Sequence, residues 1–383
     1  MIKKLHNFKL KKIDYYSNFN INDKNNVAYH LYPKNISDLK NTFILAKKIK
    51  KKILCVGNSK SWFDTIALKN GIIVNLKNFN KVLKLENKNI LKVSSNVMLN
   101  EIDKFLINKN LSLYNYPGYS NITIGGCVSN NVHGKDSFKY GTFSEKITNL
   151  KILLSNGKII NCNKNKNKEL FNSVVSGLGL IGIILEIQIK VKKIYKDVLT
   201  RSFKCKNVKE IIQHLYQDNK KYDYIYSWID TKRERGIIFK SKYIQEKNEI
   251  SKKFFFPFLD KIIKLILSFS MKNNLMSIIN YFFYILNKKE NIKKEKTKNI
   301  LNLSQSQLID LPELIHPNSF IEIQFIIPNN KKYLLKKFFK ILKKQNLESL
   351  ITGIKIHKKS IGYLSFSENG LSISLNLICN FCD

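Results

Sequence analysis

The chain has 383 residues and a formal net charge of +39, with 67 Lys and Arg against 28 Asp and Glu. A chain of this length can bury a large core and is expected to form two domains. Only three of the basic residues are arginines, whereas base reading and bidentate phosphate binding favour arginine. The scattered lysines and the abundant Asn and Ile therefore indicate a coding bias rather than nucleic-acid binding. The charge would still attract anionic lipid surfaces.

The first 195 residues mix helical and strand patterns, which predicts an α+β domain. Helices are predicted over 37–50, with Ser37 or Asp38 as the N-cap, over 99–107 and over 169–175. Strands are predicted over 53–56, 72–74, 150–154, 158–161 and 183–191. Asn156-Gly157 is a hairpin signal between the third and fourth of these strands. We expect the domain to end near Tyr195.

The segment 117–136, PGYSNITIGGCVSNNVHGKD, is the most informative stretch of the chain. Gly125 and Gly126 follow three β-favouring residues, and paired glycines after a strand let the backbone approach a bulky ligand closely. The N–H groups that follow can face a phosphate or a flavin ring. Most glycine pairs only make turns, so this interpretation depends on the whole string.

The second half has a different pattern. Strands are predicted over 222–230, 236–243 and 320–327, a helix over 331–344, and two strands within 363–379 about Glu368-Asn369-Gly370. These elements predict a second domain built on an antiparallel sheet. Residues 254–286 are rich in Phe, Ile, Leu and Tyr, but charged residues interrupt them, so they are not a good membrane-spanning helix. A buried cap helix and an interfacial amphipathic segment both remain open.

The six cysteines show no disulfide-framework spacing, which indicates a reducing compartment. Cys379 and Cys382 form a lone CxxC without a second pair for zinc, so no metal site is expected. The basic start of the chain is not followed by an apolar region, so we expect no signal peptide. The expected location is cytoplasmic, with peripheral association with the inner membrane left open.

These motifs resemble the flavoproteins of the vanillyl-alcohol oxidase type, whose PCMH-type FAD-binding domain pairs two α+β subdomains. Within that group the chain is most similar to decaprenylphosphoryl-ribose 2-oxidase and its bacterial relatives. The matching runs are Gly57–Thr65, Pro117–Asp136, Tyr140–Phe143, Asn156-Gly157, Glu169–Phe171, Gly179–Ile184, Ser227–Asp230, Phe320–Pro328 and Leu364–Phe366. The resemblance implies an FAD-binding domain over 1–195, with subdomains of about 1–77 and 78–195. A substrate-binding cap domain would follow over 196–383.

The resemblance assigns the FAD pyrophosphate to the loop 57–65 and the isoalloxazine ring to the segment 118–133. The implied FAD-binding residues are Cys55, Val56, Gly57, Asn58, Ser59, Lys60, Ser61, Trp62, Phe63, Asp64, Thr65, Gly118, Thr123, Ile124, Gly125, Gly126, Asn130, Asn131, Val132, His133 and Ile184. Phe63 stands where the family usually has glycine. Members with covalent FAD carry a histidine in the first loop, and this loop has none, so noncovalent FAD is expected.

Three residues are implied on the catalytic side. His133 would lie beside the flavin and the sugar, although a lone histidine after a glycine loop is often only a structural hydrogen-bonding group. Gln324 and Lys355 match polar positions of the cap that face the substrate. Their alternatives are an exposed strand residue and one more surface lysine.

The activity implied by the resemblance is oxidation of a sugar hydroxyl to a ketone by an FAD-dependent oxidoreductase. The substrate would be a polyprenyl-phosphate-linked pentose oxidised at C2, as half of an epimerisation in cell-envelope glycan synthesis. A short-chain NAD(P)-dependent reductase would be the partner enzyme. The alternative enzyme is an aldonolactone or alditol oxidase similar to D-arabinono-1,4-lactone oxidase.

Two non-enzymatic alternatives also stay open. The family pattern continues past position 383 with a C-terminal FAD-domain segment that carries a catalytic lysine. The resemblance therefore also allows a truncated and inactive flavin-binding remnant. A basic nucleic-acid or membrane-surface binder rests on the charge alone.

Overall fold

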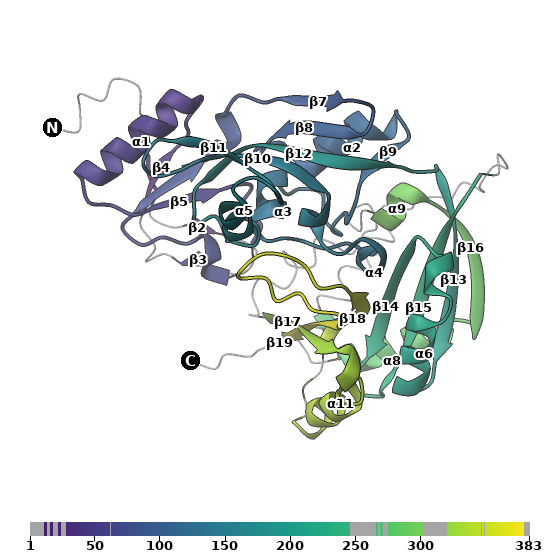
Figure 1. Ribbon diagram of the computed structural model, residues 1–383. Coiled ribbons are helices and arrows are strands. Elements are labelled where there is room, and N and C mark those ends of the chain that lie inside the picture. The colour runs from purple at the N-terminus through teal and green to yellow at the C-terminus, as the bar shows by residue number, and fades with distance from the viewer. Residues whose placement is uncertain are drawn as a thin grey trace.

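The computed structural model describes residues 11–13, 16–17, 22–23, 28–61, 63–245, 266, 269–270, 275–301, 320–345, 347 and 349–378. These residues form two lobes (Figure 1). The N-terminal lobe mixes helices with two sheets, and the C-terminal lobe is built on antiparallel strands. The predicted α+β class is confirmed. Within 254–286, most residues before the last helix lie outside the described part, as does the CxxC of 379–382.

The first part of the N-terminal lobe is a four-stranded sheet of order β1-β4-β6-β5. Its strands are β1 (Lys11–Ile13), β4 (Ala28–Leu31), β5 (Ile53–Val56) and β6 (Ile72–Asn75), and a separate short pair is β2 (Tyr16–Ser17) with β3 (Asn22–Asp23). Helix α1 (Ile36–Lys48) buries Leu39, Leu45 and Ala46 in the core of this sheet. Its N-cap is Asn35, whose side chain accepts from the Asp38 N–H, so the predicted cap at Ser37 or Asp38 was wrong by two or three positions.

The second part of the lobe is a six-stranded antiparallel sheet, ordered β11-β10-β12-β8-β7 with β9 also paired to β12. Its strands are β7 (Leu83–Glu86), β8 (Ile90–Ser94), β9 (Leu111–Leu113), β10 (Ile147–Leu153), β11 (Ile159–Cys162) and β12 (Ile183–Lys193). The helices are α2 (Leu99–Ile107), α3 (Ile124–Ser129), α4 (Ser137–Tyr140) and α5 (Lys168–Val174). Alternating apolar residues of β8, β10 and β12 face these helices and form the largest core.

The C-terminal lobe contains two antiparallel sheets, β14-β15-β13-β16 and β17-β19-β18. Their strands are β13 (Asp197–Cys205), β14 (Tyr224–Asp230), β15 (Arg235–Ile244), β16 (Glu290–Lys296), β17 (Phe320–Pro328), β18 (Ser349–His357) and β19 (Gly370–Ile378). The sheets adjoin where the Ser227 hydroxyl donates to the Ile354 carbonyl at 2.7 Å and accepts from its N–H at 2.8 Å. The helices are α6 (Val208–Tyr216), α8 (Met276–Leu286), α9 (Thr297–Leu301) and α11 (Leu334–Lys344).

The secondary structure of residues 349–369 differs from the prediction in two places. Strand β18 was not predicted, and residues 363–369 form no strand. Instead, residues 358–369 make an irregular connection between β18 and β19. Polar side chains bond locally within it, because the Ser365 hydroxyl accepts from the Ser367 N–H and the Asn369 amide accepts from the Lys359 N–H. Gly362 has a φ of +110°, which favours glycine. This connection reaches back to the N-terminal lobe.

Candidate functional site

An open cavity of about 710 Å³ lies in the N-terminal lobe, between its two sheets. Four segments line it: the end of β5 with the loop that follows, the turn after β8, the start of α3, and the approach to β12. The lining residues are Leu54, Cys55, Val56, Gly57, Ser61, Thr65, Ile66, Leu76, Ser95, Asn96, Thr123, Gly125, Gly126, Ser129, Asn130, Leu178, Gly179, Gly182 and Ile184. The structure therefore brings together loops that are separated by more than a hundred positions in the sequence.

About half of the residues predicted to bind FAD line this cavity. They are Cys55, Val56, Gly57, Ser61, Thr65, Thr123, Gly125, Gly126, Asn130 and Ile184. Others are not among its lining residues, namely Asn58, Ser59, Lys60, Gly118, Ile124, Asn131, Val132 and His133. The side chain of Ile124 is fully buried in the core. Trp62 and the side chains of Phe63 and Asp64 lie outside the described residues.

Sequence reasoning missed Ser95 and Asn96, which lie at the end of β8 and line the cavity. The Asn96 amide donates to the carbonyls of Leu76 and Phe79 at 2.9 and 2.8 Å, which fixes its orientation. Among the described residues, Ser95 Oγ and Asn96 Oδ1 are buried without a hydrogen-bond partner. Buried polar atoms are nearly always bonded, so these two atoms indicate a polar ligand in the cavity. No motif marks this pair in the sequence.

The glycine pair is arranged differently from the prediction. Gly125 and Gly126 lie in the first turn of α3, with Thr123 as its N-cap, and do not follow a strand. The Gly125 N–H donates to the Ser95 carbonyl at 2.8 Å, and the Gly126 N–H donates to Thr123 Oγ1 at 3.3 Å. The N–H groups of the pair itself are therefore used within the protein.

Gly57 and Gly125 nevertheless allow close backbone approach, but toward neighbouring protein segments. A Cβ at Gly57 would lie 2.2 Å from Thr123 Oγ1, and a Cβ at Gly125 would lie 2.8 Å from Ser95 Cβ. At Gly126 an added Cβ would meet only Thr123 Oγ1, at 3.3 Å. The two tight glycines thus let the loop after β5, the turn after β8 and the start of α3 meet around the cavity.

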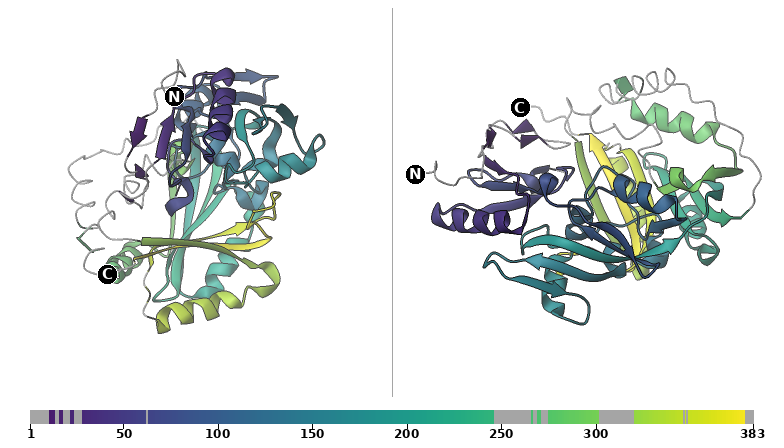
Figure 2. Two further views of the ribbon diagram at one scale, coloured as in Figure 1. Left: turned by 90° about the vertical axis from the view of Figure 1, so that its left-hand side faces the viewer. Right: turned by 90° about the horizontal axis from the view of Figure 1, so that it is seen from above.

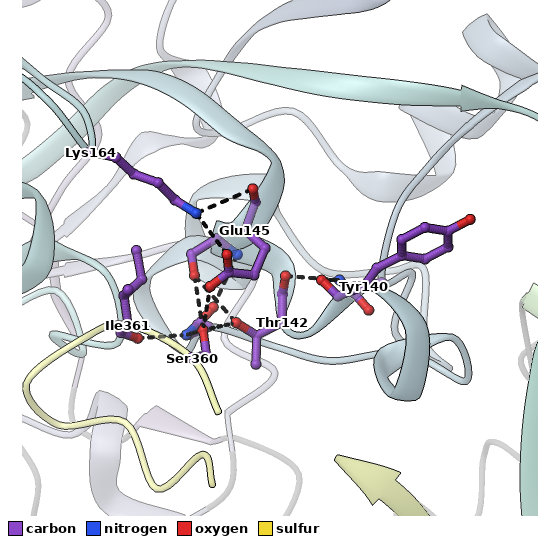
Figure 3. A network of polar contacts seen from close by, with 9 residues as sticks. Tyr140, Thr142, Glu145, Lys164, Ser360 and Ile361 are labelled. Carbon is purple, nitrogen blue, oxygen red and sulfur yellow. Dashed lines mark hydrogen bonds and ion pairs between the residues drawn. The ribbon is translucent and has the colours of Figure 1, made fainter. Parts of the chain in front are cut away.

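The connection 358–369 contacts the residues that follow α3 in the N-terminal lobe through a polar network (Figure 3). The Asn131 amide nitrogen donates to Ser360 Oγ and to the Ile361 carbonyl, and its oxygen accepts from the Ser144 N–H. Ser360 also bonds Thr142 and donates to Glu145, which pairs with Lys164 at 2.7 Å. Asn131, predicted to run along the flavin, is instead occupied in joining the two lobes.

His133 lies two residues after Asn131 in the chain and contacts Gln324 of the C-terminal lobe. Its Nε2 lies 2.8 Å from the Gln324 amide nitrogen, which also lies 3.0 Å from Ser372 Oγ. With the amide assigned in this orientation, its nitrogen donates to Nε2, which corresponds to the His133 tautomer protonated on Nδ1. The ring of His357 packs edge-on against it, with centroids 4.9 Å apart. Among the described residues, His133 Nδ1 and His357 Nε2 are buried without hydrogen-bond partners.

Two partly buried lysines lie beside these histidines. Burial lowers the pKa of Lys355, on β18, to about 8, and nearby Asp136 and Glu322 only partly offset this effect. Burial, together with the charge of Lys355, lowers the pKa of Lys135 to about 7. Lys135 Nζ donates to the Ile300 carbonyl at 2.5 Å and lies 4.4 Å from the centre of the Tyr226 ring. We call these residues, His133, Gln324, Lys355, His357 and Lys135, the histidine–lysine cluster.

The histidines of this cluster are poor proton acceptors. Burial is the main cause that lowers the pKa of His133 well below its usual value, and the charges of Lys355 and His357 add to it. Burial likewise lowers the pKa of His357 to about 4. The cluster therefore combines neutral imidazoles with amines that lose their protons near neutral pH. His357 and Lys135 were not among the predicted site residues, although Lys135 lies within the string 117–136.

Neither the cysteines nor the potential metal ligands form a second candidate site in the described part of the chain. The described cysteines are free thiols, and burial raises the pKa of Cys55 to about 12, so the thiol in the cavity stays protonated. No group of three or more potential metal-ligating residues occurs among the described residues. Within the same residues, no helix is both long enough and apolar enough to cross a bilayer.

Residues 27–163 match the family described as FAD binding domain. L-gulonolactone oxidase of Mus musculus is 24% identical over 221 residues, which cover 57% of this chain and 49% of the relative. D-arabinono-1,4-lactone oxidase of Yarrowia lipolytica is 24% identical over 163 residues, covering 41% and 31%. Cytokinin dehydrogenase 2 of Arabidopsis thaliana is 28% identical over 133 residues, covering 35% and 26%. The chain spans about half or less of the length of these curated relatives.

The N-terminal lobe is thus a PCMH-type FAD-binding domain, and FAD is its cofactor. The cavity fits this cofactor, because glycines and small polar residues line it beside apolar side chains, and Ser95 Oγ and Asn96 Oδ1 lack partners among the described residues. The prediction of an FAD-binding domain is confirmed for residues 27–163. The relatives include aldonolactone oxidases, and the comparisons give no specific support to the decaprenylphosphoryl-ribose 2-oxidase branch.

Proposed function

We propose that this protein is an FAD-dependent oxidoreductase that oxidises a CH–OH group of an aldonolactone or a related sugar derivative. The FAD-binding domain at 27–163 carries the proposal, and the lactone oxidases among the relatives favour this substrate class. When bound, FAD supplies the acceptor for the hydride that leaves the carbon. The chain would bind the cofactor in the cavity after β5 and hold the substrate against the histidine–lysine cluster.

Lys355 is the proposed proton acceptor for the substrate hydroxyl. A general base works best when its pKa lies near the operating pH, and the pKa of Lys355 is about 8. His133 has a pKa far below that range and would instead position the substrate through its Nδ1–H. Gln324 would hold the His133 ring in the required tautomer through the 2.8 Å contact to Nε2.

One feature of the cluster favours a second substrate class. Two partly buried lysines, Lys135 and Lys355, suit an anionic group better than a neutral lactone. This charge supports the alternative that the substrate is a polyprenyl-phosphate-linked pentose, with a reductase partner completing an epimerisation. Lys135 belongs to the His133–Asp136 string on which the resemblance to that branch rests.

Anaerobic mixing with candidate substrates tests both classes. The flavin-loaded protein would be mixed with D-arabinono-1,4-lactone, with L-gulono-1,4-lactone and with a prenyl-phosphoryl pentose, and loss of the flavin absorbance would be followed. Bleaching by a lactone alone supports the main proposal, and bleaching by the pentose alone supports the second. The Lys355→Met variant should bind FAD normally, and its flavin should bleach about 10²–10⁴-fold more slowly. A Lys355→Met variant whose flavin bleaches as fast as that of the parent would rule out the role of this amine as the proton acceptor.

A further inference from the structure

Helix α8 has an inverted pattern of burial. The residues it buries are Met276, Ser277, Asn280 and Tyr284, of which two are small polar residues. The residues it exposes are Ile278, Tyr281, Phe282, Phe283, Ile285 and Leu286, with exposed fractions between 41% and 80%. A surface helix of a globular protein normally turns its apolar face inward. We call the six exposed residues the α8 face.

The polar side of α8 is held to the protein by specific contacts, so the orientation of the helix is well determined. Arg233 Nη1 donates to the carbonyl and to the hydroxyl of Ser277 at 3.1 and 3.2 Å. The Tyr284 hydroxyl donates to the Cys205 carbonyl at 3.2 Å. On the same buried side, the Asn280 amide donates to the Ser349 carbonyl at 3.4 Å. Rotating the helix to bury its apolar side would break these contacts.

Basic residues surround a hollow at the C-terminal end of the same helix. The hollow has an empty volume of about 850 Å³ and is lined by Lys204, Lys206, Arg235, Tyr284 and Lys289. Lys204 Nζ donates to the last carbonyls of the helix region, at Ile285 and Asn287. The Arg235 guanidinium lies 3.9 Å from the centre of the Tyr284 ring. We call the four cationic residues the basic rim.

The basic rim can take an anionic group. Among the described residues, no acidic side chain lines the hollow. Arg235 Nη2 is buried and has no hydrogen-bond partner among the described residues, although Arg235 Nε bonds Asp230 at 3.1 Å. A buried guanidinium nitrogen without a partner is costly unless a ligand supplies an acceptor. A phosphate oxygen would satisfy it.

Seen from above, α8 and α1 lie at opposite ends of the molecule, so the α8 face does not cover the FAD cavity (Figure 2). We propose that the α8 face and the basic rim dock this protein on the surface of a bilayer that contains anionic phospholipids. The apolar side chains would enter the acyl boundary while the rim binds headgroup phosphates. A second copy of this chain fits less well, because it would bring two basic rims of a protein with net charge +39 together.

Vesicle flotation tests the proposal without any need for flavin activity. The probes are vesicles of phosphatidylcholine alone and of phosphatidylcholine mixed with phosphatidylglycerol. We expect binding to the mixed vesicles only, and we expect added salt to weaken it. Lys206→Gln combined with Lys289→Gln should lower binding about 25-fold, since each lysine near an anionic surface contributes roughly fivefold. Phe282→Ser combined with Leu286→Ser should lower it by at least about tenfold.

A matched control removes the same charge elsewhere. Lys336→Gln combined with Lys340→Gln changes two exposed lysines of α11 that do not line the hollow, and should lower binding less than about threefold. Equal loss in this control would overturn the proposal, because binding would then follow net charge. Failure of the unaltered chain to bind mixed vesicles would also overturn it. So would a dimer in sedimentation that Phe282→Ser with Leu286→Ser dissociates, because the α8 face would then bind a second copy.

Discussion

Gln324 Nε2 lies 2.8 Å from His133 Nε2, although 191 positions separate the two residues in the chain. The histidine follows helix α3 of the FAD-binding lobe, and the glutamine lies on the central part of β17 in the other lobe. The contact therefore joins the two lobes. Its donor nitrogen also sets which imidazole nitrogen of His133 carries the proton.

We predict that the FAD is held without a covalent bond. The loop 57–65 contains no histidine, and burial keeps the Cys55 thiol of the cavity protonated by raising its pKa to about 12. Precipitation of the flavin-loaded protein with acid should release the yellow colour into the supernatant. Colour that stays with the precipitate would contradict this prediction, and a protein that takes up no FAD would remove the basis of the proposed activity.

The two glycines of α3 should respond differently to substitution. Gly126→Val places its side chain where only Thr123 Oγ1 lies nearby, so the chain should fold and lose FAD occupancy as the side chain enters the cavity. Gly125→Val meets Ser95 Cβ at 2.8 Å and the Ser95 carbonyl at 2.9 Å, so it should lower the free energy of unfolding by about 1–3 kcal/mol. Urea unfolding and flavin absorbance separate the two effects. If both variants changed the free energy of unfolding and the FAD occupancy to the same extent, the different surroundings inferred for Gly125 and Gly126 would be contradicted.

Replacing Lys355 should stabilise the protein while it removes activity. The folded pKa is about 8 and the unfolded value is about 10.4, so below pH 8 the charged amine is buried at its full cost. Between pH 8 and 10 the folded state loses its proton first, and this cost declines. Lys355→Met should therefore raise the free energy of unfolding at pH 7 by up to about 3 kcal/mol, and less as the pH rises.

Urea titrations of the Lys355→Met variant at several pH values provide the measurement. The exposed Lys358→Met on the neighbouring connection is a suitable control and should change stability by less than about 0.5 kcal/mol. A Lys355→Met variant that is less stable than the parent at pH 7 would show that the amine is satisfied by its surroundings.

The ion pair between Lys192 and Asp136 should be important for stability. Lys192 Nζ lies 2.6 Å from Asp136 Oδ2, and the two side chains are only 8% and 2% exposed. Lys192→Met would leave the Asp136 carboxylate buried without its cation, which should cost about 3–5 kcal/mol. Lys164→Met breaks the exposed pair with Glu145 and should cost under about 1 kcal/mol. Adding Asp136→Asn to Lys192→Met should restore part of the lost stability, and no restoration would point to lost packing instead.

The sequence alone was sufficient for most elements of the FAD-binding lobe. Helix α2 runs over Leu99–Ile107 as predicted, and β5, β6, β10, β11 and β12 lie within two residues or so of their expected bounds, except that β10 begins three residues earlier. These elements carry strong local signals, namely helical or alternating apolar periodicity and an Asn-Gly turn. The cofactor was implied by the resemblance, which rests on runs that are continuous in the chain, namely the string 117–136 and the loop after β5.

Only the tertiary structure could decide how these pieces are used. Ser95 and Asn96 carry no motif, and they become cavity residues because β8 ends against α3. The Gly125 N–H donates to the Ser95 carbonyl, and the Gly126 N–H donates to Thr123, which is the N-cap of the helix that begins there. The amine of Lys355 has a pKa near 8 because folding removes it from water, and one more lysine among so many gives no sign of this in the sequence. Likewise, α8 is mostly apolar, and only the contacts of its Ser277 with Arg233 and of its Tyr284 with Cys205 determine which side meets the solvent.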